Sequence, residues 1–262
     1  MVDQGFRNAA RDAFGSYTAR YDGGDERIAL KIEHTYEVAA LCERIACDEG
    51  LDARDVDLAW LCGLLHDIGR FEQLRRWNTF SDAASCSHAM LGLDVLGTEL
   101  VHFTDNAAWT PLIRKAVAHH SDYRLPVDLS DREHIFCTIT RDADKVDILR
   151  VFNQSSCDAV LGMAPGEFCH GRISDTALVG FRERRCLSRD ERVESLDGLL
   201  GTVCLVFELE HRAARAAVCE RGYLEHLLDA PFGLDAVFAN VVTQDRWNEV
   251  RAAMRAWESA QG

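Results

Sequence analysis

An unbroken apolar run that ends in a polar pair is the feature that most constrains how this chain folds. Residues 58–65 read LAWLCGLL, and His66 and Asp67 follow directly. Such continuous apolarity is typical of a buried helix. Two ionisable groups at the end of a buried helix are costly unless a partner satisfies them. A divalent metal ion is a suitable partner, because imidazole and carboxylate both bind first-row divalent ions well.

Other candidate ligands occur along the chain, each with an alternative structural role. His34 lies on the apolar face of a helical pattern in residues 30–45, where a core histidine is the ordinary interpretation. His88 begins a later pattern, where a polar residue in the first turn is the alternative. His119 and His120 end a short amphipathic run, where contact with the helix dipole is the alternative. Because all of them fall at or near apolar faces of successive helices, a shared site is favoured.

Two acidic residues complete the set of candidate ligands. Asp142 and Asp144 lie in residues 139–149, which read ITRDADKVDIL. Solvated positions, or ion pairs with the neighbouring Arg141 and Lys145, are the alternatives. Helical periodicity does not choose between the two carboxylates, since each shares a face with its own apolar residues.

The order of these residues resembles the HD-domain superfamily of metal-dependent phosphohydrolases. The stretches similar to bacterial members read LLHDIGRFEQ, SHAMLGLDVL, AVAHHSDY and RDADKVDIL. The resemblance covers about residues 26–155. It implies an all-α fold, an HD-domain helical bundle with additional C-terminal helices.

The resemblance also implies a metal site. The matching positions for the first ion are His34, His66, Asp67 and Asp144. Asp144 matches better than Asp142, because the family ligand usually precedes a basic residue, here Lys145. A second ion, as in binuclear members, is implied at His88 with one or both of His119 and His120, with Asp67 as the bridge. Mn or Fe is the expected metal, and Mg, Ni, Co and Zn are the alternatives.

The implied activity is hydrolysis of a nucleotide or another small phosphate ester by metal-activated water. Whether the substrate is a monoester or a diester stays open. Arg70 and Lys31 each lie one helical turn from a candidate ligand, and with Asp67 they form the predicted catalytic set. Plain salt bridges are the alternative for both cations. An HD-type di-iron oxygenase and a non-catalytic metal or nucleotide sensor are the alternative functions.

Composition limits the partners and the location. The net charge of −14 argues against long nucleic acid, whose binding depends on Lys and Arg, but a small phosphorylated substrate needs only a local positive patch. The 10 cysteines form no CxxC pair, which indicates reduced thiols in a cytoplasmic protein. The amino terminus lacks the apolar core of a signal peptide, and no membrane contact is expected.

The chain of 262 residues is expected to form one domain, with a motif-bearing core at about 26–155 and a helical extension at about 156–262. The expected helices are residues 4–20, 26–48, 53–76, 86–97, 110–121, 131–154, 191–228 and 234–259. The basic segment 155–190 is interpreted as a solvated loop and helix, with a mobile cover over phosphate as the alternative. The last two helices are expected to complete the core, and a homodimer surface is the alternative.

Overall fold

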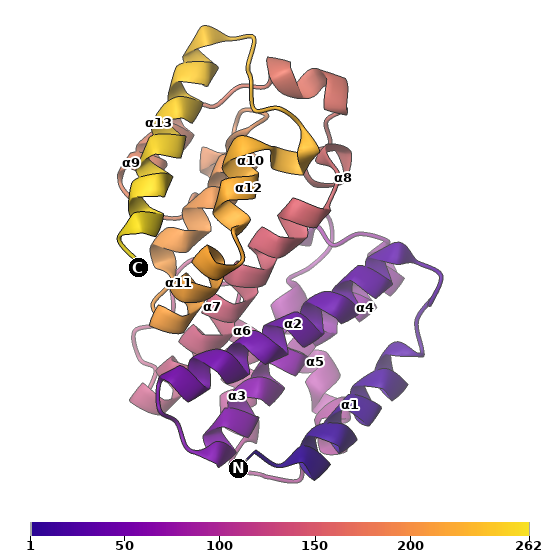
Figure 1. Ribbon diagram of the computed structural model, residues 1–262. Helices are drawn as coiled ribbons and strands as arrows, with labels where there is room; N and C mark the ends of the chain where they lie inside the picture. The colour runs from indigo at the N-terminus through magenta and orange to yellow at the C-terminus, as the bar shows by residue number, and fades with distance from the viewer. Residues whose placement is uncertain (1, 262) are drawn as a thin grey trace. The chain divides into compact units, whose positions relative to one another are not determined.

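The computed structural model describes residues 2–261, and within them it is helical without a β-strand (Figure 1). The all-α prediction is therefore confirmed. The chain divides into two compact units, one that extends to Asp144 and one that starts at Lys145. That the two units act as one domain stays a prediction. Within the described residues, no helix combines the length and the apolarity needed to cross a membrane.

The first unit is built from six helices and the start of a seventh. They are α1 (Gln4–Thr18), α2 (Glu26–Asp48), α3 (Ala53–Leu65), α4 (Ile68–Trp77), α5 (His88–Glu99), α6 (Thr110–His119) and α7 (Asp131–Gln154), within which the unit boundary falls. Side-chain N-caps explain where α2, α3 and α5 begin. The caps are Asp25, Asp52 and Ser87, each of which accepts a hydrogen bond from a backbone amide in the first turn.

The apolar run of residues 58–65 forms the end of α3, and every residue in it is buried. Gly63 allows α3 to pack closely on α2. A Cβ atom at this position would lie 2.8 Å from Cα of Ala39 and 2.8 Å from Sγ of Cys42, closer than real side chains come. Helix α3 therefore ends in the interior of the unit, and the polar pair that follows it, His66 and Asp67, is buried as well.

The predicted helix 53–76 is wrong in one respect, because the chain forms two helices over these residues. His66 is the C-cap of α3, and Asp67 leaves the helical path with φ of −106° and ψ of 18° before α4 begins. Gly69 then brings α5 against α4, since a Cβ atom there would lie 2.3 Å from the carbonyl oxygen of His88 and 2.5 Å from the nitrogen of Gly92. Both features hold His66, Asp67 and His88 close together.

The second unit contains further helices after α7. They are α8 (Cys157–Leu161), α9 (Asp175–Arg182), α10 (Asp197–Val203), α11 (Arg212–Glu220), α12 (Tyr223–Asp229) and α13 (Val241–Ser259). The prediction of one long helix over residues 191–228 is wrong. After α10 the chain forms a short 3₁₀ turn and then becomes extended at Leu209, and Gly222, with φ of 63°, separates α11 from α12. Glycine adopts this left-handed conformation without the steric penalty of a side chain.

Packing and ion pairs account for much of the second unit. Trp247 of α13 is fully buried, and its indole nitrogen donates a hydrogen bond to a backbone carbonyl at the end of α12, 3.0 Å away. Two arginines of the basic segment are engaged in salt bridges. Arg182 contacts Glu249 at 2.7 Å, and Arg185 contacts Glu191 at 2.6 Å. The interpretation of the segment as a solvated loop and helix, and the alternative of a mobile cover, both stay predictions.

An Asp57→Ala substitution is expected to lower the free energy of unfolding by about 3 kcal/mol or more. The carboxylate of Asp57 lies 2.6 Å from Nε of Arg7, and both side chains are buried. The substitution therefore removes one of the two acidic partners of a buried guanidinium and leaves Glu43, which is partly exposed. Asp55→Ala in the same helix is the matched control, because Arg132, its partner, is exposed and the expected loss is below about 1 kcal/mol. Urea unfolding measures both losses, and equal losses would contradict the prediction.

Candidate metal centre

Six ionisable side chains from distant parts of the sequence meet inside the first unit. They are His34 of α2, His66 and Asp67 between α3 and α4, His88 at the start of α5, His120 at the end of α6, and Asp144 of α7. The first five are buried, and the side chain of Asp144 is only 14 % exposed. Two sets of three donors in this cluster, His34 with His66 and Asp144, and His66 with Asp67 and His120, are each close enough together to hold a metal ion. Taken with His88, the distances divide the cluster into two groups around Asp67.

The first group surrounds His34 and His66. Their Nε2 atoms lie 3.1 Å apart, and Oδ1 of Asp144 lies 3.2 Å and 3.7 Å from them, respectively. Oδ2 of Asp67 lies 3.6 Å from Nε2 of His34 and 3.7 Å from Nε2 of His66. Bonds of about 2.1 Å to one ion place neighbouring donor atoms about 3.0 to 3.4 Å apart. The four donors therefore fit a single divalent ion.

The second group lies on the other side of Asp67. The Nε2 atoms of His88 and His120 are 3.0 Å apart, and Oδ1 of Asp67 is 3.5 Å from each of them. Among the described residues this buried oxygen accepts no hydrogen bond, although Nε of Arg70 lies 3.4 Å from it. Because an unsatisfied buried carboxylate oxygen is costly, its position next to two imidazoles fits a second cation. The two oxygens of Asp67 thus face two different groups.

Contacts at the far ring nitrogens orient three of the histidines. Nδ1 of His66 lies 2.7 Å, and Nδ1 of His120 lies 2.8 Å, from a backbone carbonyl one turn earlier in the chain. Nδ1 of His88 lies 2.7 Å from Oδ2 of Asp82. A hydrogen bond donated by Nδ1 selects the neutral tautomer whose Nε2 lone pair points into the centre, which is the form that binds a metal ion.

Burial and charge set the protonation states of the centre. Burial lowers the pKa of His66 to about 3 and also lowers the pKa of His88, although Asp82 opposes the second shift. Burial would raise the pKa of Asp67, but the Lys31 ammonium and other nearby positive groups hold it well below its usual range. Neutral imidazoles and an ionised carboxylate at neutral pH are the states required for metal binding.

Both cations of the predicted catalytic set lie at Asp67. Nζ of Lys31 is 2.6 Å from Oδ2 of this carboxylate, and Nε of Arg70 is 3.4 Å from Oδ1. Nη1 of Arg70 also donates hydrogen bonds to Oδ1 of Asp82 at 2.9 Å and to the carbonyl oxygen of Phe80 at 2.6 Å. Arg70 therefore holds the loop after α4 as well as facing the centre. The phosphate-binding role of both cations stays a prediction.

The structure distinguishes the candidate ligands within two pairs that the sequence left open, His119 or His120 and Asp142 or Asp144. His120 belongs to the second group, whereas His119 is partly exposed and its Nδ1 lies 2.7 Å from a carboxylate oxygen of Asp122. Asp144 places a carboxylate oxygen beside the first pair of histidines, as the resemblance implied, and is the better candidate than Asp142. His119 is therefore the one predicted ligand that the structure does not bring to either group.

Asp82 is a functional candidate that the sequence analysis missed. Besides the contact with His88, its other oxygen accepts hydrogen bonds from Nη1 of Arg70 and Nε2 of Gln73, both at 2.9 Å. The residue lies in a polar loop without periodicity, and a carboxylate six positions before a histidine is a weak signal. Only the folded loop shows that Asp82 joins the second group to α4.

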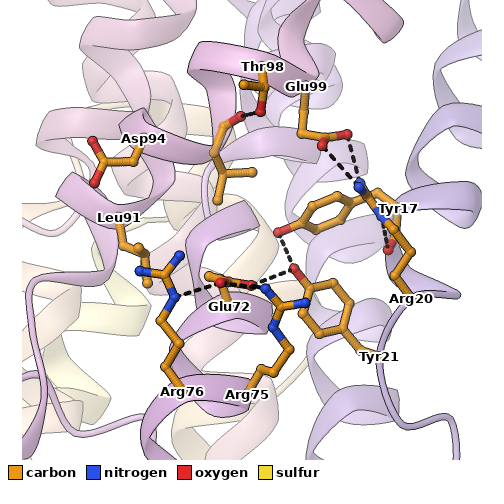
Figure 2. A pocket seen from close by; sticks show the side chains of 11 residues that line it. Tyr17, Arg20, Tyr21, Glu72, Arg75, Arg76, Leu91, Asp94, Thr98 and Glu99 are labelled. Carbon is orange, nitrogen blue, oxygen red and sulfur yellow. Dashed lines mark hydrogen bonds and ion pairs between the residues drawn. The ribbon is translucent and has the colours of Figure 1, made fainter.

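A separate cavity of about 240 Å³ lies between α1, α4 and α5. Figure 2 shows that charged side chains line it and that they pair with one another. Glu72 accepts hydrogen bonds from Arg75 and Arg76 at 2.6 Å each, and Arg20 contacts Glu99 at 2.7 Å. The charges that line this cavity are therefore largely paired with one another, and the cavity is separate from the metal centre.

The metal-free protein is expected to lose stability as the pH falls from about 6.5 to about 3. Burial holds the pKa of His66 at about 3, below the ordinary value of 6.5, so in this range the unfolded chain binds a proton that the folded protein excludes. The free energy of unfolding then falls on acidification, by up to about 1.4 kcal/mol per pH unit for this group. Urea unfolding at several pH values measures the slope. His66→Gln should show a shallower slope, and an unchanged slope would refute the explanation.

Comparison with known proteins adds one finding. Residues 32–149 match the family model of the HD domain, a span that contains every member of both groups. No curated protein and no solved structure gives a significant match to the chain.

Proposed function

Because residues 32–149 place this chain in the HD-domain superfamily, whose members are generally metal-dependent hydrolases, we propose that it hydrolyses a nucleotide or another small phosphate ester. The observation that carries the proposal is the position of Asp67. Its two carboxylate oxygens face two separate pairs of histidine nitrogens at 3.5 to 3.7 Å. A shared carboxylate between two cations is the arrangement that two-metal phosphoryl-transfer sites use.

The donor set supports particular metals. The first ion would be held by His34, His66, Asp144 and Oδ2 of Asp67, and the second by His88, His120 and Oδ1 of Asp67. Imidazole and carboxylate without thiolate favour Mn or Fe, with Mg, Co, Ni and Zn as alternatives. When bound, such ions lower the pKa of a water ligand towards neutrality and polarise phosphoryl oxygens.

The remaining chemistry belongs to the side chains of this protein. Lys31 and Arg70 place two positive charges at the edge of the centre, where they would orient the phosphate. The guanidinium of Arg70 is also held by hydrogen bonds to the loop, whereas the ammonium of Lys31 contacts Asp67. The acidic net charge supports a small substrate, because a polyanion would be repelled by the rest of the surface.

Neighbouring histidines provide a matched test of the proposal. Purified protein is stripped of metal, reloaded with Mn, Fe, Mg, Co, Ni or Zn, and analysed for bound ions. Hydrolysis is then measured as release of p-nitrophenol from p-nitrophenyl phosphate and bis-p-nitrophenyl phosphate, and as release of phosphate from nucleotides. His120→Ala should abolish metal-dependent hydrolysis, whereas the outward-facing His119→Ala should retain it. Bound iron with oxygen consumption and no hydrolysis would instead support an oxygenase. Absence of metal binding with every ion would overturn the proposal.

A further inference from the structure

Phe80 lies beside the metal centre, in the loop between α4 and α5. Its carbonyl oxygen accepts a hydrogen bond from Nη1 of Arg70 at 2.6 Å. The centre of its ring lies 5.7 Å from Nζ of Lys31 and 5.9 Å from Cζ of Arg70. These are the same two cations that contact Asp67. The ring therefore lies next to the two cations that face the metal centre.

Phe80 lies in a polar stretch of the chain and is not part of the buried core. The loop around it is polar and reads NTFSD over residues 78–82. The ring is partly exposed, although the chain buries most of its other phenylalanines in the core. Lys31 and Arg70 lie at distances from the ring at which a cation attracts an aromatic face. A partly exposed aromatic surface thus adjoins the groups that would hold a phosphate.

We propose that Phe80 selects phosphate esters whose leaving group carries a planar ring. The inference rests on the proposed function, since it takes Lys31 and Arg70 as the phosphate-orienting groups. A phosphate drawn to these cations would have its ester substituent next to the ring. Stacking on an aromatic side chain strengthens binding of a planar group by roughly tenfold or more, whereas an aliphatic group of similar size gains much less.

Phosphonates test this selection without turnover. The Mn-loaded protein is titrated calorimetrically with phenylphosphonate and with methylphosphonate, which keep the charged head group but cannot be hydrolysed. The wild type should bind the phenyl compound roughly tenfold more tightly. Phe80→Leu should remove most of this preference without weakening the binding of methylphosphonate. Phe80→Tyr, which retains a ring face, should preserve the preference for the phenyl compound. Thermal melting and metal content verify that each variant is folded and loaded.

The outcomes separate the inference from the proposed function. Binding of both phosphonates with the same preference in the wild type and in Phe80→Leu would overturn the selection by Phe80 and leave the hydrolase proposal intact. Failure of the loaded wild type to bind either phosphonate would overturn both. A loss of preference in Phe80→Leu that Phe80→Tyr does not show would support the stacking surface, because a general packing defect would weaken both ligands.

Discussion

Asp67→Asn is expected to remove most of the metal from the protein and to lower kcat/KM by roughly a thousandfold or more. The two oxygens of this carboxylate face both groups of histidines, so one substitution affects both. An amide keeps the shape of the side chain but offers only one oxygen, and its NH₂ group does not bind a cation. The amide also removes the negative charge that pairs with Lys31 and Arg70, which leaves two positive charges facing an incoming ion.

Asp122→Asn is the matched control for this variant. Asp122 also contacts a histidine, at 2.7 Å, but the pair lies outside both groups. Metal content by mass spectrometry and hydrolysis of the best substrate are measured for both variants, together with circular dichroism. We expect the control to resemble the wild type. Normal metal content in Asp67→Asn would show that the carboxylate is not a ligand and would contradict the bridging role.

The helices that carry the centre could be predicted to a large extent from the sequence. Apolar periodicity is a local signal, and it located α2, α6 and α7 within a few residues. The division of residues 53–76 into two helices was not predictable in this way. The apolar pattern continues across His66 and Asp67, so no local signal marks the break. In the structure α5 packs closely on α4 at Gly69, two residues after it.

The ligands could be predicted as a set but not all individually. His119 and His120 both follow the same amphipathic run, and adjacent helical residues point in directions about 100° apart. Only the positions of neighbouring helices decide which one turns inward. The same holds for Asp142 and Asp144, which lie two residues apart on α7. Asp82 had no pattern at all, because its role arises from a loop that folds back onto α4.

That loop leads to the second large prediction, which concerns the second group alone. Asp82→Asn is expected to weaken binding of the second ion by roughly 10- to 100-fold while the first ion stays bound. One oxygen of Asp82 accepts a hydrogen bond from His88, and the other accepts from Arg70 and Gln73. Whichever way the amide of asparagine is oriented, its NH₂ group faces one of these donors. The imidazole of His88 then loses the contact that fixes its tautomer, or Arg70 releases the loop.

Metal titration of the stripped protein distinguishes this effect from a general loss of structure. The two proteins are compared at metal concentrations that fill both sites of the wild type but only the tighter site of the variant. Under these conditions the wild type should bind two ions and Asp82→Asn should bind one. Asp94→Asn makes the same chemical change at an exposed position of α5 and should leave both sites intact. Equally weaker binding of both ions would show that Asp82 stabilises the whole centre and not the second group alone. An unchanged stoichiometry and affinity would show that α5 alone orients His88, because the crossing at Gly69 already fixes the start of that helix.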